Sequence, residues 1–192
     1  MRIILVTVSL ALLVIVSAVP VSNLKDELKD AAKQTFIRID QWAIRRIFSM
    51  AKTILDNNMM EPPDMEKTQH FVDHWESRNN SLAQNDMQIV SFEMDFMEIM
   101  SKYPEDSPVA NVGLANVSEM KKFAGDRLAE FQSSATEMIR VAKKAGYTDD
   151  SLDEVYDKFA ENNDILFKSM FFVKLLSYLN AFDKSVLDQI IN

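Results

Sequence analysis

Apolar side chains recur at three- and four-residue steps along most of this chain, which is the period of one face of an α-helix. The longest such pattern covers residues 24–55 and predicts one long amphipathic helix. Its apolar positions are Leu24, Leu28, Ala31, Phe36, Ile39, Ala43, Ile47, Met50 and Ile54. The Asp-Asn-Asn of residues 56–58 is expected to end this helix. The two prolines at 62–63 then favour the start of a second one.

The middle of the chain divides into further helical segments. A second helix is expected over residues 64–78, and a third runs from the capping box of Ser81 and Gln84 to about residue 102. Residues 103–117 hold two prolines and a glycine without apolar periodicity, so they are expected to form the longest loop. A fourth helix is expected to begin at an Asn116 cap and to continue through residue 145.

The last third of the chain carries one more long helical pattern. It starts at residue 151 with a capping box and continues through residue 182, with a weak point at residues 162–163. A short helix is expected over residues 184–191. The predicted fold class is therefore all-α, a single-domain bundle of five or six helices after a cleaved signal peptide. The low glycine count, three in all, supports this class because the turns of all-β folds consume glycine.

The first residues have the pattern of a secretory signal. Arg2 is followed by an apolar run over residues 3–16 and then by small residues ending in Ala18. This pattern predicts a signal peptide over residues 1–18 and a secreted, extracellular α-helical domain over residues 19–192. A membrane anchor is the alternative, because the apolar run extended to residue 21 approaches the ~20 residues that span a bilayer.

Composition narrows the chemistry and the partners. The absence of cysteine excludes disulfides, thiolate metal sites and cysteine nucleophiles. The net charge is −8, and it becomes −9 when cleavage of the predicted signal peptide removes Arg2. Nucleic acid is therefore not an expected partner. With three glycines there is no phosphate-binding loop, dinucleotide fingerprint or nucleophile elbow. We therefore expect no enzyme activity and no cofactor.

The two histidines lie four residues apart, at His70 and His74. This spacing would offer two nitrogens to one zinc ion on a helix. However, Phe71 stands where a hydrolytic zinc helix needs its glutamate base, and Asp73 points about 60–100° away from the pair. No metal site is therefore predicted. If the two rings stay together, protonation at low pH would add like charges and produce a weak pH response.

Residues 87–100, MQIVSFEMDFMEIM, contain four methionines and two phenylalanines but no leucine. On a helix they form two apolar stripes, which predicts that this helix is covered on two sides. The stripes are Met87, Val90, Met94 and Met97, and Ile89, Phe92, Phe96 and Ile99. Residues 165–182 are apolar in nearly every direction. Methionine side chains fill irregular spaces and adapt to variable partners.

Two functions fit these soft apolar helices. The first is binding or carrying of a small apolar ligand, such as a fatty acid or retinoid, between them. The candidate lining residues are Phe92, Met94, Phe96, Met97, Phe167, Met170 and Phe171. The second is a secreted protein-interaction module, for example an effector, venom or immune-modulating component, with no small-molecule ligand. A core that simply uses methionine and phenylalanine for packing is the remaining interpretation.

Two N-glycosylation sequons are present, at Asn79 and at Asn116. Both are expected at loop or helix boundaries, where a glycosylated asparagine of a secreted protein usually lies.

Production in a eukaryotic secretory host should release a chain that begins at Val19, because the small residues ending at Ala18 suit signal peptidase. N-terminal sequencing and intact mass of the secreted product measure this. Recovery of the whole chain from the membrane fraction, with residues 1–18 attached, would instead support the membrane anchor.

Overall fold

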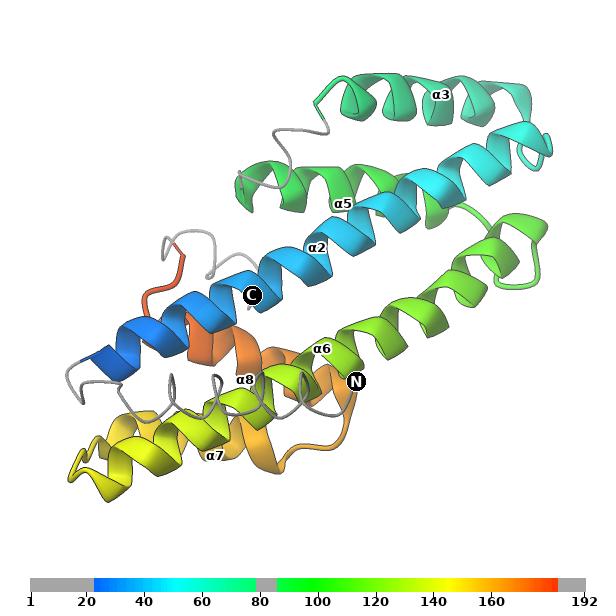
Figure 1. The fold of residues 1–192 in the computed structure, drawn as a ribbon. Coiled ribbons are helices and arrows are strands. Elements are labelled where there is room, and N and C mark those ends of the chain that lie inside the picture. Colours follow the sequence, from blue (N-terminus) through cyan, green and yellow to red (C-terminus); the bar gives the residue numbers. More distant parts are fainter. Residues whose placement is uncertain (1–22, 79–85, 183–192) are drawn as a thin grey trace, which may run out of the picture. The chain divides into compact units, whose positions relative to one another are not determined.

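The computed structural model describes residues 23–78 and 86–182, and every regular element among them is an α-helix (Figure 1). The six helices are α2 (Leu24–Asp56), α3 (Pro62–Glu76), α5 (Asp86–Met100), α6 (Pro108–Lys144), α7 (Asp150–Glu161) and α8 (Ile165–Tyr178). The predicted all-α class is thus confirmed for this part of the chain. The predicted signal peptide, the Ser81 cap, the sequon at Asn79 and the helix over 184–191 lie outside the described residues.

The helices gather into two compact units, which we describe separately. Of the described residues, 36–78 and 86–126 belong to the α3–α5 unit, and 23–35 and 127–182 belong to the α7–α8 unit. Helices α2 and α6 each contribute residues to both units. The expectation of one domain over residues 19–192 stays a prediction.

Five aromatic side chains from three helices, Phe48, Phe71, Trp75, Phe92 and Phe96, form the centre of the α3–α5 unit; we call them the aromatic cluster. The fully buried Phe92 ring has its centroid 5.2 Å from those of Phe48 and Phe71. It lies 5.6 Å from Trp75, edge to face. Phe96 extends the cluster, 5.6 Å from Phe71. Such pairs add about 0.5–1.5 kcal/mol each beyond the burial of their area.

The helix ends of α2 and α3 follow from local chemistry. Asn58 has a φ of 49°, the left-handed conformation that asparagine tolerates better than most residues. The amide of Met59 then donates to the carbonyl of Ile54 and closes the end of α2. Helix α3 starts with two prolines. Proline lacks a backbone N–H, and the first turn of a helix has no intrahelical acceptor for that group. Its buried residues recur at helical spacing and are Thr68, Phe71, Val72 and Trp75.

On helix α5 the two apolar stripes differ in burial among the residues whose side chains are described, 91–100. Phe92, Phe96 and Ile99 are buried, whereas the side chains of Met94 and Met97 are 66% and 67% exposed. The prediction that this helix is covered on both sides is therefore wrong for these two residues. The aromatic cluster covers α5 from the side of α2 and α3, so the methionine side is left open to solvent.

The loop predicted over residues 103–117 is confirmed only for residues 103–107 and is wrong beyond them, because α6 begins at Pro108. Proline is well suited to the first position of a helix. The hydroxyl of Ser107 caps the helix by accepting a hydrogen bond from the backbone amide of Ala110. Gly113 does not break the helix. A Cβ there would lie 3.1 Å from the terminal methyl of Met100, so glycine permits this close approach. Asn116 is consequently inside α6, not at its cap as predicted.

The weak point expected at residues 162–163 separates two helices of the α7–α8 unit. Helix α7 ends before it, and Asp164 then caps α8 by accepting the amide of Leu166 at 2.9 Å. The unit has an aromatic centre of its own, in which the centroids of Phe131 and Phe172 lie 5.1 Å apart. Phe159 lies 5.7 Å from both rings.

Asp149 joins three helices of the α7–α8 unit. Its carboxylate caps α7 by accepting the amide of Leu152, forms an ion pair with Lys25 at 2.6 Å, and accepts the hydroxyl of Tyr178 at 2.9 Å. The hydrogen bond from Lys25, followed by that from the Leu152 amide, holds the pKa of Asp149 below its ordinary value of 3.8. The start of α2, the start of α7 and the end of α8 therefore meet at one charged group.

Asp149→Asn should lower the urea midpoint near neutral pH, because asparagine can still cap α7 but cannot form the ion pair with Lys25. The folded pKa of Asp149 is depressed, so its contribution is complete above 3.8 and is lost as the pH falls below that value. The difference in urea midpoint between the unmodified protein and Asp149→Asn should become smaller below about pH 3.8, as measured by urea titrations followed by circular dichroism. A difference in midpoint that stays the same at every pH would contradict the ion pair.

Phe92→Ala should lower the free energy of unfolding by about 3–5 kcal/mol, because it removes a fully buried ring from the aromatic cluster. The matched control is Met97→Ala on the same helix. Its side chain is exposed, so the change should stay within about 0.5 kcal/mol. Urea denaturation measures both, and equal losses would contradict the one-sided burial of α5.

Candidate functional site

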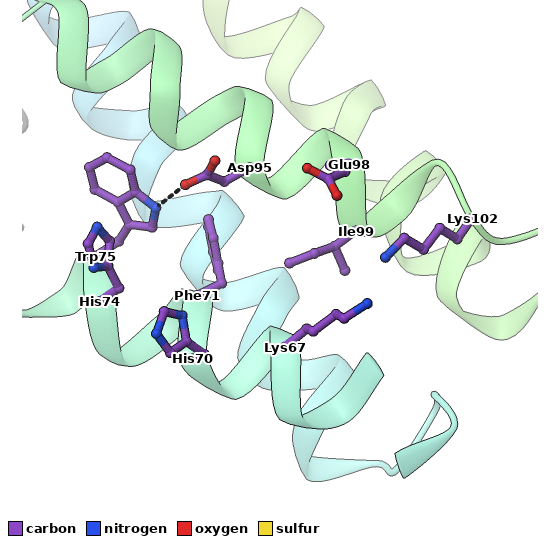
Figure 2. A pocket seen from close by; sticks show the side chains of 9 residues that line it. All are labelled: Lys67, His70, Phe71, His74, Trp75, Asp95, Glu98, Ile99 and Lys102. Carbon is purple, nitrogen blue, oxygen red and sulfur yellow. Dashed lines mark hydrogen bonds between the residues drawn. The ribbon is translucent and has the colours of Figure 1, made fainter. Parts of the chain in front are cut away.

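A groove with a volume of about 430 Å³ runs between α3 and α5 and is open to solvent (Figure 2). All of its lining residues come from these two helices or from the turn directly after α5. They are Lys67, His70, Phe71, His74, Trp75, Asp95, Glu98, Ile99 and Lys102. The site therefore lies entirely within the α3–α5 unit.

The floor of the groove is apolar and is the surface of the unit's core. Phe71, Trp75 and Ile99 line it while being 4%, 4% and 8% exposed. Phe71 and Trp75 also belong to the aromatic cluster and rest on Phe92. The floor is consequently held rigidly, because these side chains cannot move without disturbing the packing between α3 and α5.

At one end of the groove a hydrogen bond joins the two helices. The indole Nε1 of Trp75 donates to the Oδ2 of Asp95 at 2.9 Å, drawn as a dashed line in Figure 2. Because a buried indole N–H requires an acceptor, this bond fixes both the ring and the neighbouring carboxylate. We call this part of the site the tryptophan end.

The two histidines lie on the α3 edge of the groove. Their rings are nearly parallel, with centroids 6.1 Å apart, and the His74 ring meets Trp75 edge-on at 4.9 Å. Their spacing predicted a shared side of the helix, and both line the groove. Within residues 23–78 and 86–182, no group of three histidine, cysteine, aspartate or glutamate side chains is placed to hold a metal ion.

The other end of the groove carries two lysines, and we call it the lysine end (Figure 2). The Nζ of Lys102 lies 3.7 Å from an oxygen of Asp64, a carboxylate that also accepts the Tyr103 hydroxyl at 2.9 Å. Burial and this bond to Asp64 raise the pKa of Tyr103 to about 12. In the described part of the chain, Lys67 has no carboxylate within ion-pair distance. Glu98 lies on the α5 edge.

The seven ligand-lining residues predicted from the sequence lie elsewhere. Phe92 and Phe96 are in the aromatic cluster, beneath the floor, and the exposed Met94 and Met97 do not line the groove. On α8, Phe167 and Met170 are 57% and 37% exposed, and Phe171 is half-buried. These three belong to the α7–α8 unit. A ligand site between α5 and α8 therefore stays a prediction.

Sequence reasoning identified part of the groove without recognising it as a site. The spacing of the histidines in the α3 sequence drew attention to His70, Phe71 and His74, but not to Lys67 or Trp75. On α5, Asp95 and Glu98 lie outside both apolar stripes of the helical pattern, on its polar side. A usable signal was present, because Lys67, His70 and His74 share one helical face beside two aromatic residues. What the sequence lacked was the pairing of that face with α5.

The described sequon residue, Asn116, is half-buried in α6, and its side-chain amide donates to the carbonyl of Val112 at 2.8 Å. Glycosylation at Asn79 and Asn116 stays a prediction.

Among the described helices, none combines the length and the apolar character that crossing a membrane requires. No known protein family, no curated protein and no solved structure matches this chain.

Asp95→Ala should lower the free energy of unfolding by about 1–3 kcal/mol, because it leaves the buried indole N–H of Trp75 without its acceptor. Glu98→Ala is the matched control on the same edge of the groove. Its side chain is exposed, and the expected change is within about 0.5 kcal/mol. Urea denaturation compares the two, and an unchanged Asp95→Ala protein would contradict the bond.

Proposed function

We propose that this protein is secreted and binds a small apolar ligand in the groove between α3 and α5. The observation that carries the proposal is the apolar floor of Phe71, Trp75 and Ile99 between two polar edges. The volume of about 430 Å³ is within the ~300–1,000 Å³ that small-molecule sites usually have.

Burial of an apolar ligand on this floor removes hydrocarbon from water, worth about 25 cal/mol per Å² of buried area. The edges orient the ligand, because the few polar groups of such a site fix the direction in which it binds. One side of the groove is open to solvent, so part of the ligand stays in contact with water. We therefore expect micromolar dissociation constants for the groove, not nanomolar ones.

The secretory part of the proposal rests on the sequence. Residues 1–18 have the cationic start, apolar run and small-residue end of a signal peptide. A chain without cysteine is also unaffected by the redox difference between the cytosol and the extracellular space. No reaction is assigned to the groove, and we propose a binding protein without enzyme activity.

A second candidate function, protein interaction, is supported by large apolar side chains that are exposed. On α5 these are Met94 and Met97, on α6 Leu114 and Val117, and on α8 Leu166, Phe167 and Met170. Exposed large apolar side chains are one feature of protein-interaction sites. This function does not require the groove, so a loss of ligand binding would leave it as the better proposal.

The neutral fluorescent probe N-phenylnaphthylamine should bind to the protein and be displaced by dodecanol, because both can cover the apolar floor. Ile99→Thr, which makes this floor more polar, should weaken probe binding about threefold or more. Met97→Thr is the matched control, since it makes the same kind of change on the exposed side of α5 and should leave binding unchanged.

Fluorescence titration gives the dissociation constants, and circular dichroism verifies that both variants remain helical. If the probe does not bind, or if Ile99→Thr and Met97→Thr weaken binding equally, the groove is not the ligand site.

A further inference from the structure

The two ends of the groove differ in the charge that they offer to a ligand. At the tryptophan end the charged lining residue is Asp95, whose carboxylate is held in place by the Trp75 indole. Arg78, which does not line the groove, lies 5.8 Å from the centroid of the Trp75 ring. At the lysine end two ammonium groups, those of Lys67 and Lys102, lie beside the apolar Ile99 (Figure 2). An amphiphile with a charged headgroup would therefore bind in one direction only.

Both ammonium groups retain the capacity to bind an anion. Ion pairs of lysine elsewhere in the protein are short, 2.6 Å for Lys25 with Asp149 and 2.8 Å for Lys52 with Glu76. By contrast, Lys102 lies 3.7 Å from Asp64, and Lys67 has no such carboxylate among the described residues. A carboxylate has two oxygens that accept hydrogen bonds, so it can accept from more than one ammonium donor.

We infer that the groove binds a long-chain carboxylate, with its headgroup at the lysine end and its apolar tail along the floor toward Trp75. This inference rests on the proposed function and adds the chemical class and the direction of the ligand. Two carboxylates oppose an anion there, that of Glu98 on the α5 edge and that of Asp64 beside Lys102. Removing the charge of Glu98 should consequently strengthen binding, whereas removing either lysine should weaken it.

Three ligands with the same tail and different headgroups test the inference: dodecanoate, dodecanol and dodecylamine. The background is Trp42→Phe, which keeps the ring that stacks on Phe123 and leaves Trp75 as the single tryptophan reporter in the groove. The expected order of affinity is dodecanoate, then dodecanol, then dodecylamine.

The variants separate the headgroup from the tail. The double variant Lys67→Gln/Lys102→Gln should weaken the binding of dodecanoate about three- to tenfold and leave the affinity for dodecanol unchanged. Glu98→Gln should strengthen the binding of dodecanoate and leave the affinity for dodecanol unchanged. Lys122→Gln, at an exposed lysine of α6 outside the groove, is the control and should affect neither ligand.

The outcomes distinguish this inference from the function on which it rests. If none of the three ligands changes the Trp75 fluorescence, both the proposed function and the inference fail. If dodecanol and dodecanoate bind equally, or if the double lysine variant leaves dodecanoate unchanged, only the inference is overturned. Tightest binding of dodecylamine would also overturn it, because Asp95 and Glu98 would then select the headgroup.

Discussion

The contact of Phe92 with Phe48, Phe71 and Trp75 is the constraint on which the α3–α5 unit depends. It joins three helices through one fully buried ring, and it fixes the side of α3 that faces α5. The groove floor is the outer surface of this packing. Stability and the proposed ligand binding would therefore be coupled, because a change in a floor residue alters the core and the groove together.

The polar edges give this apolar floor its direction. The Trp75–Asp95 bond satisfies an indole N–H that would otherwise be buried without an acceptor, and it also fixes a negative charge at one end. The lysines at the other end are engaged more weakly by the protein itself. Binding energy would come mainly from the floor, whereas the charges would decide which headgroup is accepted and how it is oriented.

The α7–α8 unit is held together by a different combination of forces. Its aromatic centre of Phe131, Phe159 and Phe172 supplies the apolar packing. Asp149 supplies a polar junction between three helix ends, where one carboxylate serves as cap, ion-pair partner and hydrogen-bond acceptor. In a chain without cysteine, packing and capping of this kind must provide the stability that other proteins obtain from disulfides.

By itself the sequence determined the helical class, most helix positions, the break at residues 162–163 and the shared face of His70 and His74. Periodicity and capping are local properties, so they can be read without knowing the neighbours. Only the tertiary structure decided that Met94 and Met97 face solvent, that Pro108 starts a helix, and that α3 and α5 together form a groove. The physical reason is that a helical period shows which residues share a face, whereas burial depends on which other helix covers that face.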